Sequence, residues 1–131
     1  MAKIIDSEGN LLALVIPFES IKEEKYFPTE NSQEMQVAAF NLKKNTIIDN
    51  HIHLDQERNI NSTSEVIVVL DGSIKVNIFD ESLNLVTVEE LRKGDTIALF
   101  MGGHGIEVTE DSKFVEAKQG PYLEDIDKKR F

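Results

Sequence analysis

The chain has 131 residues, which is enough for one hydrophobic core, and it contains no cysteine. Disulfides and thiolate metal ligands are therefore excluded. Its 24 acidic and 14 basic residues give a formal net charge of −10, which argues against nucleic acid or an anionic membrane surface as a partner.

The longest purely apolar stretch, Leu11 to Ile16, is far shorter than the roughly 20 residues that span a bilayer. Lys3, Asp6 and Glu8 do not fit the order of regions in a signal peptide. No linker or repeat marks a domain boundary. We therefore expect a single domain over residues 1–131 that is soluble and cytoplasmic.

Short apolar runs separated by turn residues predict an all-β chain of about ten strands. The first two strands form an N-terminal hairpin around residues 7–10, and Asp71-Gly72 predicts a two-residue hairpin turn. Spacing alone does not choose between a jelly roll and another barrel. The predicted strands are 3–5, 11–18, 35–42, 46–53, 66–71, 73–79, 85–88, 96–101, 106–109 and 113–118, with a helical turn over 88–93.

All three histidines of the chain belong to one pattern of candidate metal ligands. If His51-Ile52-His53 is a strand, both imidazoles lie on one face, about 6.6 Å apart at the backbone. Glu65 opens the apolar run that precedes Gly72, and His104 lies among glycines that permit close approach of a ligand. Three imidazoles and one carboxylate could converge on one ion.

These residues resemble the two motifs of the cupin family. The first motif covers about 45–72, with Asn45 in place of the leading glycine, and the second covers about 94–108. The resemblance implies a double-stranded β-helix, the cupin jelly-roll barrel, with the N-terminal hairpin as a short extension and a homodimer as the assembly. It also implies a divalent metal, either Zn, Mn, Fe or Ni, bound by His51, His53, Glu65 and His104, with a coordination position left open.

One alternative concerns the carboxylate ligand. Glu57 follows His53 after three residues, whereas eleven residues separate His53 from Glu65. Glu65 is the preferred ligand because it begins a strand and stands six residues before Gly72. Glu57 then lines the site, where it could serve as a base.

The resemblance further implies a small enzyme of sugar or nucleotide-sugar metabolism, of the isomerase or epimerase type. Its catalytic candidates are His51, His53, His104 and Glu57, and Arg58 and Lys118 are candidates for binding a small-molecule substrate. Two alternatives stay open. One is a metal-dependent dioxygenase, with apolar walls supplied by residues such as Ile67, Val69 and Leu99, and the other is a non-catalytic binding protein.

Overall fold

The computed structural model describes residues 1–131 and contains ten strands, one short 3-10 helix and no α-helix. The prediction of an all-β chain is confirmed. No helix is long and apolar enough to cross a membrane. The elements are β1 (Ala2–Ile5), β2 (Leu11–Ile16), η1 (Phe18–Ser20), β3 (Lys25–Tyr26), β4 (Ala39–Phe40), β5 (Glu65–Asp71), β6 (Ser73–Phe79), β7 (Leu85–Arg92), β8 (Thr96–Leu99), β9 (Gly103–Val108) and β10 (Lys113–Lys118).

The strands form three antiparallel sheets, and these do not close into one barrel. The largest has five strands in the order β1-β2-β8-β5-β10, and the second has three in the order β7-β6-β9. The two-residue strands β3 and β4 pair with each other only. The predicted N-terminal hairpin is present, since β1 pairs with β2.

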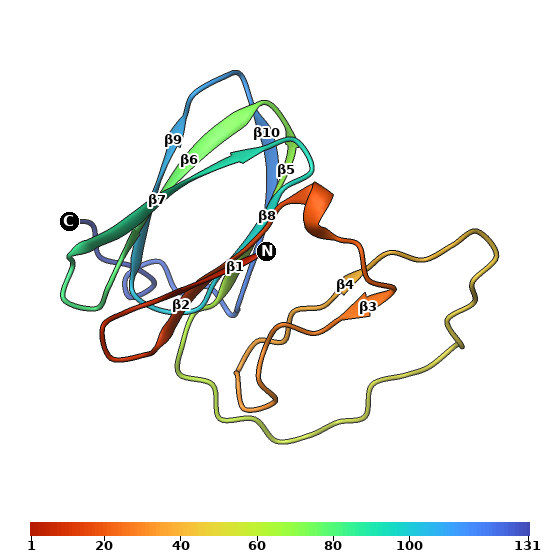
Figure 1. Ribbon diagram of the computed structural model, residues 1–131. Helices are drawn as coiled ribbons and strands as arrows, with labels where there is room; N and C mark the ends of the chain where they lie inside the picture. Colours follow the sequence, from red (N-terminus) through yellow and green to blue (C-terminus); the bar gives the residue numbers. More distant parts are fainter.

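The five-stranded and three-stranded sheets face each other across the main core (Figure 1). On β6, the alternating residues Ile74, Val76 and Ile78 point into this core, as the two-residue period of a strand requires. Ile67 and Val69 of β5 meet them from the other sheet. Each such fully buried side chain contributes about 1.5–3 kcal/mol relative to exposure.

The five-stranded sheet is also covered on its outer face. Leu14, Ile16, Ala98 and Phe100 form a second buried cluster, against which residues of the 21–37 segment pack. This explains why Leu11 to Ile16 is apolar at every position: a strand buried on both faces loses the usual alternation.

Three local predictions were wrong. Residues 46–53 form no strand, because no neighbouring strand supplies hydrogen-bond partners for them. The predicted helical turn over 88–93 is part of β7, which pairs with β6 up to Arg92. Asp71-Gly72 does not join two paired strands: β5 and β6 belong to different sheets, and Gly72, at φ +81°, turns the chain from one sheet to the other.

Residues 41–64, which we call the arm, contain no strand or helix. In Figure 1 the arm runs from β4 to β5 as a long open loop that reaches away from the two packed sheets. It carries both histidines of the predicted pair.

Candidate metal centre

Glu65 and His104 meet where the two large sheets approach each other. Glu65 is the first residue of β5, on the same side of that strand as the buried Ile67 and Val69. His104 is the second residue of β9, in the other sheet. The Nε2 atom of His104 lies 2.9 Å from Oε2 of Glu65. Two of the four predicted ligands are therefore in contact, although 39 positions of sequence separate them.

The contact leaves one carboxylate oxygen without a well-directed donor. The Glu65 side chain is 12% exposed and that of His104 is 31% exposed. Oε2 of Glu65 is buried, and no donor points at it with hydrogen-bond geometry. A buried, ionised oxygen of this kind is costly unless a cation or a donor compensates it. The pair therefore presents an acceptor that a metal ion would satisfy.

The electrostatic surroundings keep Glu65 ionised. The polar contact with His104 is the largest cause that lowers its pKa, and partial burial opposes this effect. The charges of His104, Lys118 and Lys128 lower the pKa further. An ionised carboxylate is the form that binds a divalent cation.

His51 and His53 lie in the arm and are both exposed. Their rings stand edge to face with centroids 5.3 Å apart. Nδ1 of His51 lies 2.8 Å from the carbonyl oxygen of Asp49. Because a carbonyl can only accept, Nδ1 donates in this contact, and Nε2 has no partner in the chain. Asn45, at the position of the motif's leading glycine, has φ +71°, the left-handed conformation that asparagine tolerates.

The structure does not bring the two pairs together. It contains no group of three or more His, Asp or Glu side chains placed to hold a metal. The predicted set of His51, His53, Glu65 and His104 is thus divided into an arm pair and a pair between the sheets. The four-ligand site stays a prediction that needs the arm histidines to approach β9.

The remaining predicted site residues differ in their placement. Glu57 and Arg58 are exposed in the arm and form no hydrogen bond or ion pair. Lys118 ends β10 directly opposite Glu65 in the strand register. Its Nζ atom lies 2.9 Å from Asp127 and 4.9 Å from the centre of the Tyr122 ring. The hydrogen bond with Asp127 raises the pKa of Lys118, so this cation stays charged beside Glu65.

The apolar residues considered as pocket walls are core residues instead. Ile67 and Val69 are fully buried, and Leu99 is nearly so, within the cluster between the sheets. They hold β5 and β8 in place as part of the main core. A hollow of about 240 Å³ does adjoin Lys118, where Ile60 and Ser62 of the arm meet Ala117 and Gln119.

The C-terminal residue lies beside Gly103, the neighbour of His104 in the sequence. The Phe131 ring packs edge to face on Phe79, with centroids 5.0 Å apart. It also fills the space beside Gly103, where a Cβ atom would stand 2.7 Å from the ring. The apolar terminal residue is the only signal in the sequence for this contact.

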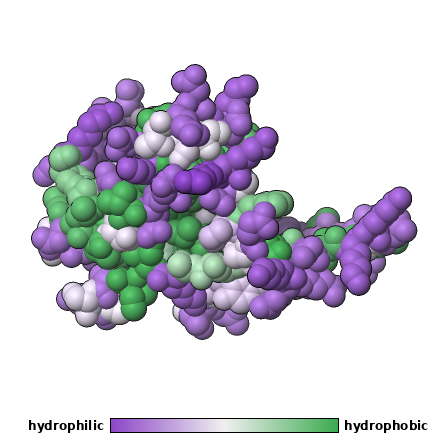
Figure 2. Space-filling view, turned by 45° about the horizontal axis from the view of Figure 1, so that its top comes forward, coloured by the Kyte–Doolittle hydropathy of each residue, from purple (hydrophilic) through white to green (hydrophobic).

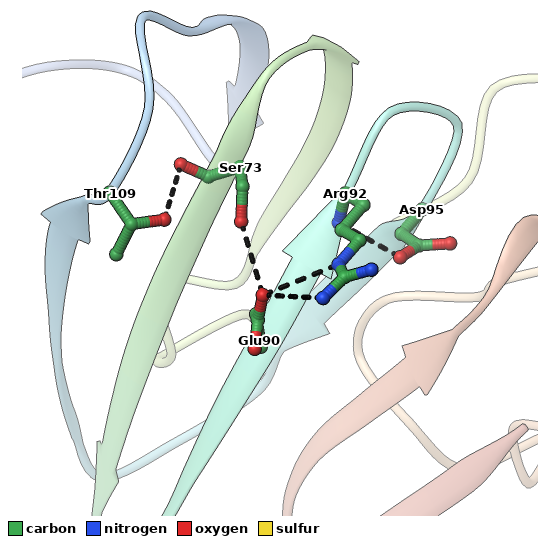
Figure 3. A network of polar contacts seen from close by, with 5 residues as sticks. All are labelled: Ser73, Glu90, Arg92, Asp95 and Thr109. Atoms are coloured by element: carbon green, nitrogen blue, oxygen red, sulfur yellow. Dashed lines mark hydrogen bonds and ion pairs between the residues drawn. The ribbon is translucent and has the colours of Figure 1, made fainter.

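A second polar cluster lies at the opposite end of β5, about 20 Å from Glu65 for a strand of this length. Figure 3 shows Glu90 accepting from Arg92 at 3.1 and 3.3 Å and from the hydroxyl of Ser73 at 3.5 Å. Thr109 donates to the carbonyl oxygen of Ser73 at 3.0 Å, and Asp95 accepts from the backbone N–H of Arg92 at 2.9 Å. These groups pair among themselves and hold the strand ends together.

Comparison with known families gives one match. Residues 22–91, which are more than half of the chain, match the family described as "Domain of unknown function (DUF6016)", and the chain belongs to this family. The matched region contains the arm, Glu65 and β5 to β7, whereas His104 and Lys118 lie outside it. No curated protein and no solved structure matches the chain.

Proposed function

We propose that the protein is a metal-binding cupin in which the two large sheets are the two layers of a jelly roll. The observation that carries the proposal is the contact between Glu65 and His104, one from each sheet, in which the buried Oε2 of Glu65 has the imidazole beside it but no well-directed donor. The residues fit a divalent cation: the carboxylate is ionised and an imidazole nitrogen is beside it. Glu65 and His104 would hold the ion, and His51 and His53 would complete its ligand set.

The proposed reaction is isomerisation or epimerisation of a small sugar, phosphorylated or linked to a nucleotide. A divalent metal held by these ligands supplies polarisation of a substrate carbonyl. Glu57 on the arm is the candidate base that would move the proton next to that carbonyl. Lys118 and Lys128, whose charges reach Glu65, would attract an anionic substrate group to the same end of the sheets, with Arg58 as a further cation from the arm.

The hollow beside Lys118 lies on the outer face of β5 and β10, opposite the face that carries Glu65, so it could receive only a part of the substrate remote from the metal. Its volume of about 240 Å³ and its lining by Ser62, Ser64 and Gln119 offer hydroxyl and amide groups to a polar ligand. It combines residues of the arm base with residues of β10.

Exchange of solvent deuterium into a nucleotide-linked or phosphorylated sugar tests the reaction. The protein loaded with zinc or manganese should catalyse exchange next to the carbonyl, and the His104→Ala variant should not. Exchange at the same rate in both, or in neither, would refute the sugar chemistry. Oxygen consumption by the iron-loaded protein with a thiol, diketone or aromatic diol would instead favour a dioxygenase. Ligand binding without turnover would instead favour a non-catalytic binding protein.

A further inference from the structure

The two large sheets end in four edge strands, and one of them lacks the usual protection against pairing with another chain. Exposed edges are commonly blunted by lysine or arginine and by irregular ladders. The ladders of β1, β7 and β10 each contain a register shift, and these strands carry Lys3, Arg92, and Lys113 with Lys118, respectively. The ladder of β9 is regular, and its sequence from Gly103 to Val108 contains no lysine, arginine or proline.

The arm is the matching unpaired segment. Its apolar side chains are unusually exposed: Ile47 is 83% exposed, Ile48 59%, Ile52 82% and Leu54 76%. Figure 2 shows the arm projecting from the body of the molecule as a separate lobe. As a strand it would place Ile48, Ile52 and Leu54 on one face and the two histidines on the other. A segment of this composition gains stability only when another surface covers it.

We propose that residues 46–54 of a second copy add to the free edge of β9, and that the exchange is reciprocal, giving a strand-exchanged homodimer. Every copy has both an unpaired arm and a free β9 edge, so in a two-fold symmetric dimer each arm pairs with the β9 edge of the other copy. Main-chain hydrogen bonds along β9 provide the pairing, and Ile106 and Val108, 36% and 56% exposed, are the apolar side chains that the arm meets.

Charge favours the antiparallel direction. Lys43-Lys44 precede the pairing segment, and Glu107, Glu110 and Asp111 surround the turn at the far end of β9. In an antiparallel pair the two lysines reach this acidic turn. In a parallel pair they would lie near Gly103 instead, and the acidic turn would face Asp55 and Glu57. Opposite charges thus select the first arrangement.

The base of the arm explains why the partner is a second copy. Glu34 accepts from the backbone N–H of Ser62 at 3.0 Å and of Asn61 at 3.4 Å, and also from the Ser62 hydroxyl. At the other end Asn41 donates to the carbonyl oxygens of Lys22 and Glu24, each at 3.2 Å. With both ends fixed in this way, the arm extends away from its own sheets and presents its residues to another molecule (Figure 1).

The exchange would also complete the candidate metal centre, an inference that rests on the proposed function. Antiparallel pairing brings His51 and His53 of the partner subunit to the His104 end of β9. In the register that sets Ile47 opposite Val108, these histidines lie on the same face as His104, beside Glu65; with Ile48 opposite Val108 they lie on the other face and the site stays incomplete. Each site would then take two ligands from each chain. The dimer itself needs no metal, so the two proposals can fail separately.

Disulfide trapping tests the exchange, because the natural chain has no cysteine. The variant Ile48→Cys/Val108→Cys, oxidised at micromolar protein in the presence of chelator, should form a covalent dimer. Ile47→Cys/Val108→Cys covers a register shifted by one residue. The matched control is Ile48→Cys/Leu85→Cys, since Leu85, on the edge strand β7, is 55% exposed against 56% for Val108. We expect trapping roughly 1,000-fold faster than in the control, because docking raises the effective thiol concentration from micromolar to millimolar.

A disulfide within one chain, giving a covalent monomer, would overturn the exchange and show that the arm closes on its own β9. Trapping equal to the control, or a monomer mass for the natural chain in light scattering, would also overturn it. Metal binding is then measured separately by mixing His51→Ala/His53→Ala with His104→Ala. Recovery of metal in the mixed dimer alone is expected, whereas trapping without recovery would leave the dimer intact and contradict the metal site.

Discussion

Gly72→Ala should destabilise the protein by far more than an ordinary glycine substitution, because two costs combine there. At φ +81° an alanine is strained by about 1–2 kcal/mol. An added Cβ would also stand 2.3 Å from the carbonyl oxygen of Asp111 and from Oγ of Ser112, so the chain between β9 and β10 must move.

That movement breaks the contacts that tie this chain to Ser73. The hydroxyl of Ser112 accepts from the backbone N–H of Ser73 at 3.0 Å, and it lies 3.0 Å from the carbonyl oxygen of the same residue. Two hydrogen bonds contribute about 0.5–1.5 kcal/mol each. The total cost is therefore about 3 kcal/mol, which corresponds to a decrease in Tm of roughly 10 °C for a chain of this size.

Gly9→Ala is the matched control for this measurement. Gly9 has φ +89°, but a Cβ there would meet nothing within 4 Å. The strain is comparable, and the effect of alanine on the unfolded chain is the same, so the difference between the two variants isolates the collision. Thermal and urea unfolding should show that Gly72→Ala is less stable than Gly9→Ala by about 1–3 kcal/mol. Equal destabilisation would refute the packing argument.

Three further predictions concern the core, the tail and the base of the arm. Ile74→Ala, at a fully buried position, should lower the free energy of unfolding by about 2–5 kcal/mol in urea titration, and a loss near zero would contradict the shared core. Phe131→Ala should lower the free energy of unfolding by no more than about 1.5 kcal/mol, and it should speed hydrogen exchange of the Gly103 backbone amide. An unchanged exchange rate would show that the ring does not cover that residue. Hydrogen bonds from Ser62 lower the pKa of Glu34, so their contribution is present above the ordinary glutamate pKa and is lost as pH falls through the lowered value. The amide signal of Ser62 in NMR should therefore titrate with a midpoint below the ordinary glutamate pKa and stay flat in Glu34→Gln; a midpoint at or above that value would contradict the contact.

The positions of strands could be predicted from the sequence wherever a strand-like pattern of residues also has a partner strand in the fold. Strands β5 and β6 were located almost to the residue, because alternation or a continuous apolar run there coincides with burial. Strand β10 was located as well, although it is mostly exposed, and it pairs with β5 along its length. The β-branched residues of 46–53 gave the same signal without a partner strand. Their pattern therefore predicted a strand that this chain alone does not form.

The sequence predicted part of the geometry of the candidate site, and its metal chemistry stays a prediction. The sequence order of Glu65 and His104 indicated a shared site, and their 2.9 Å contact agrees with that expectation. The position of the arm histidines could not follow from spacing, because the residues between His53 and Glu65 impose no fixed path. The role of Gly72 was also misassigned: the sequence identified a turn, but which strands it joins depends on sheet pairing far along the chain.

Metal binding by the four predicted ligands is tested by the metal content of the natural chain, measured beside His51→Ala/His53→Ala and Glu65→Gln after purification without chelator. We expect stoichiometric divalent metal in the natural chain and its loss in both variants, with unfolding curves that show all three folded. A natural chain that binds no metal even when supplied with zinc, manganese, iron or nickel would rule out the metal centre. Metal that both variants retain would rule out these ligands.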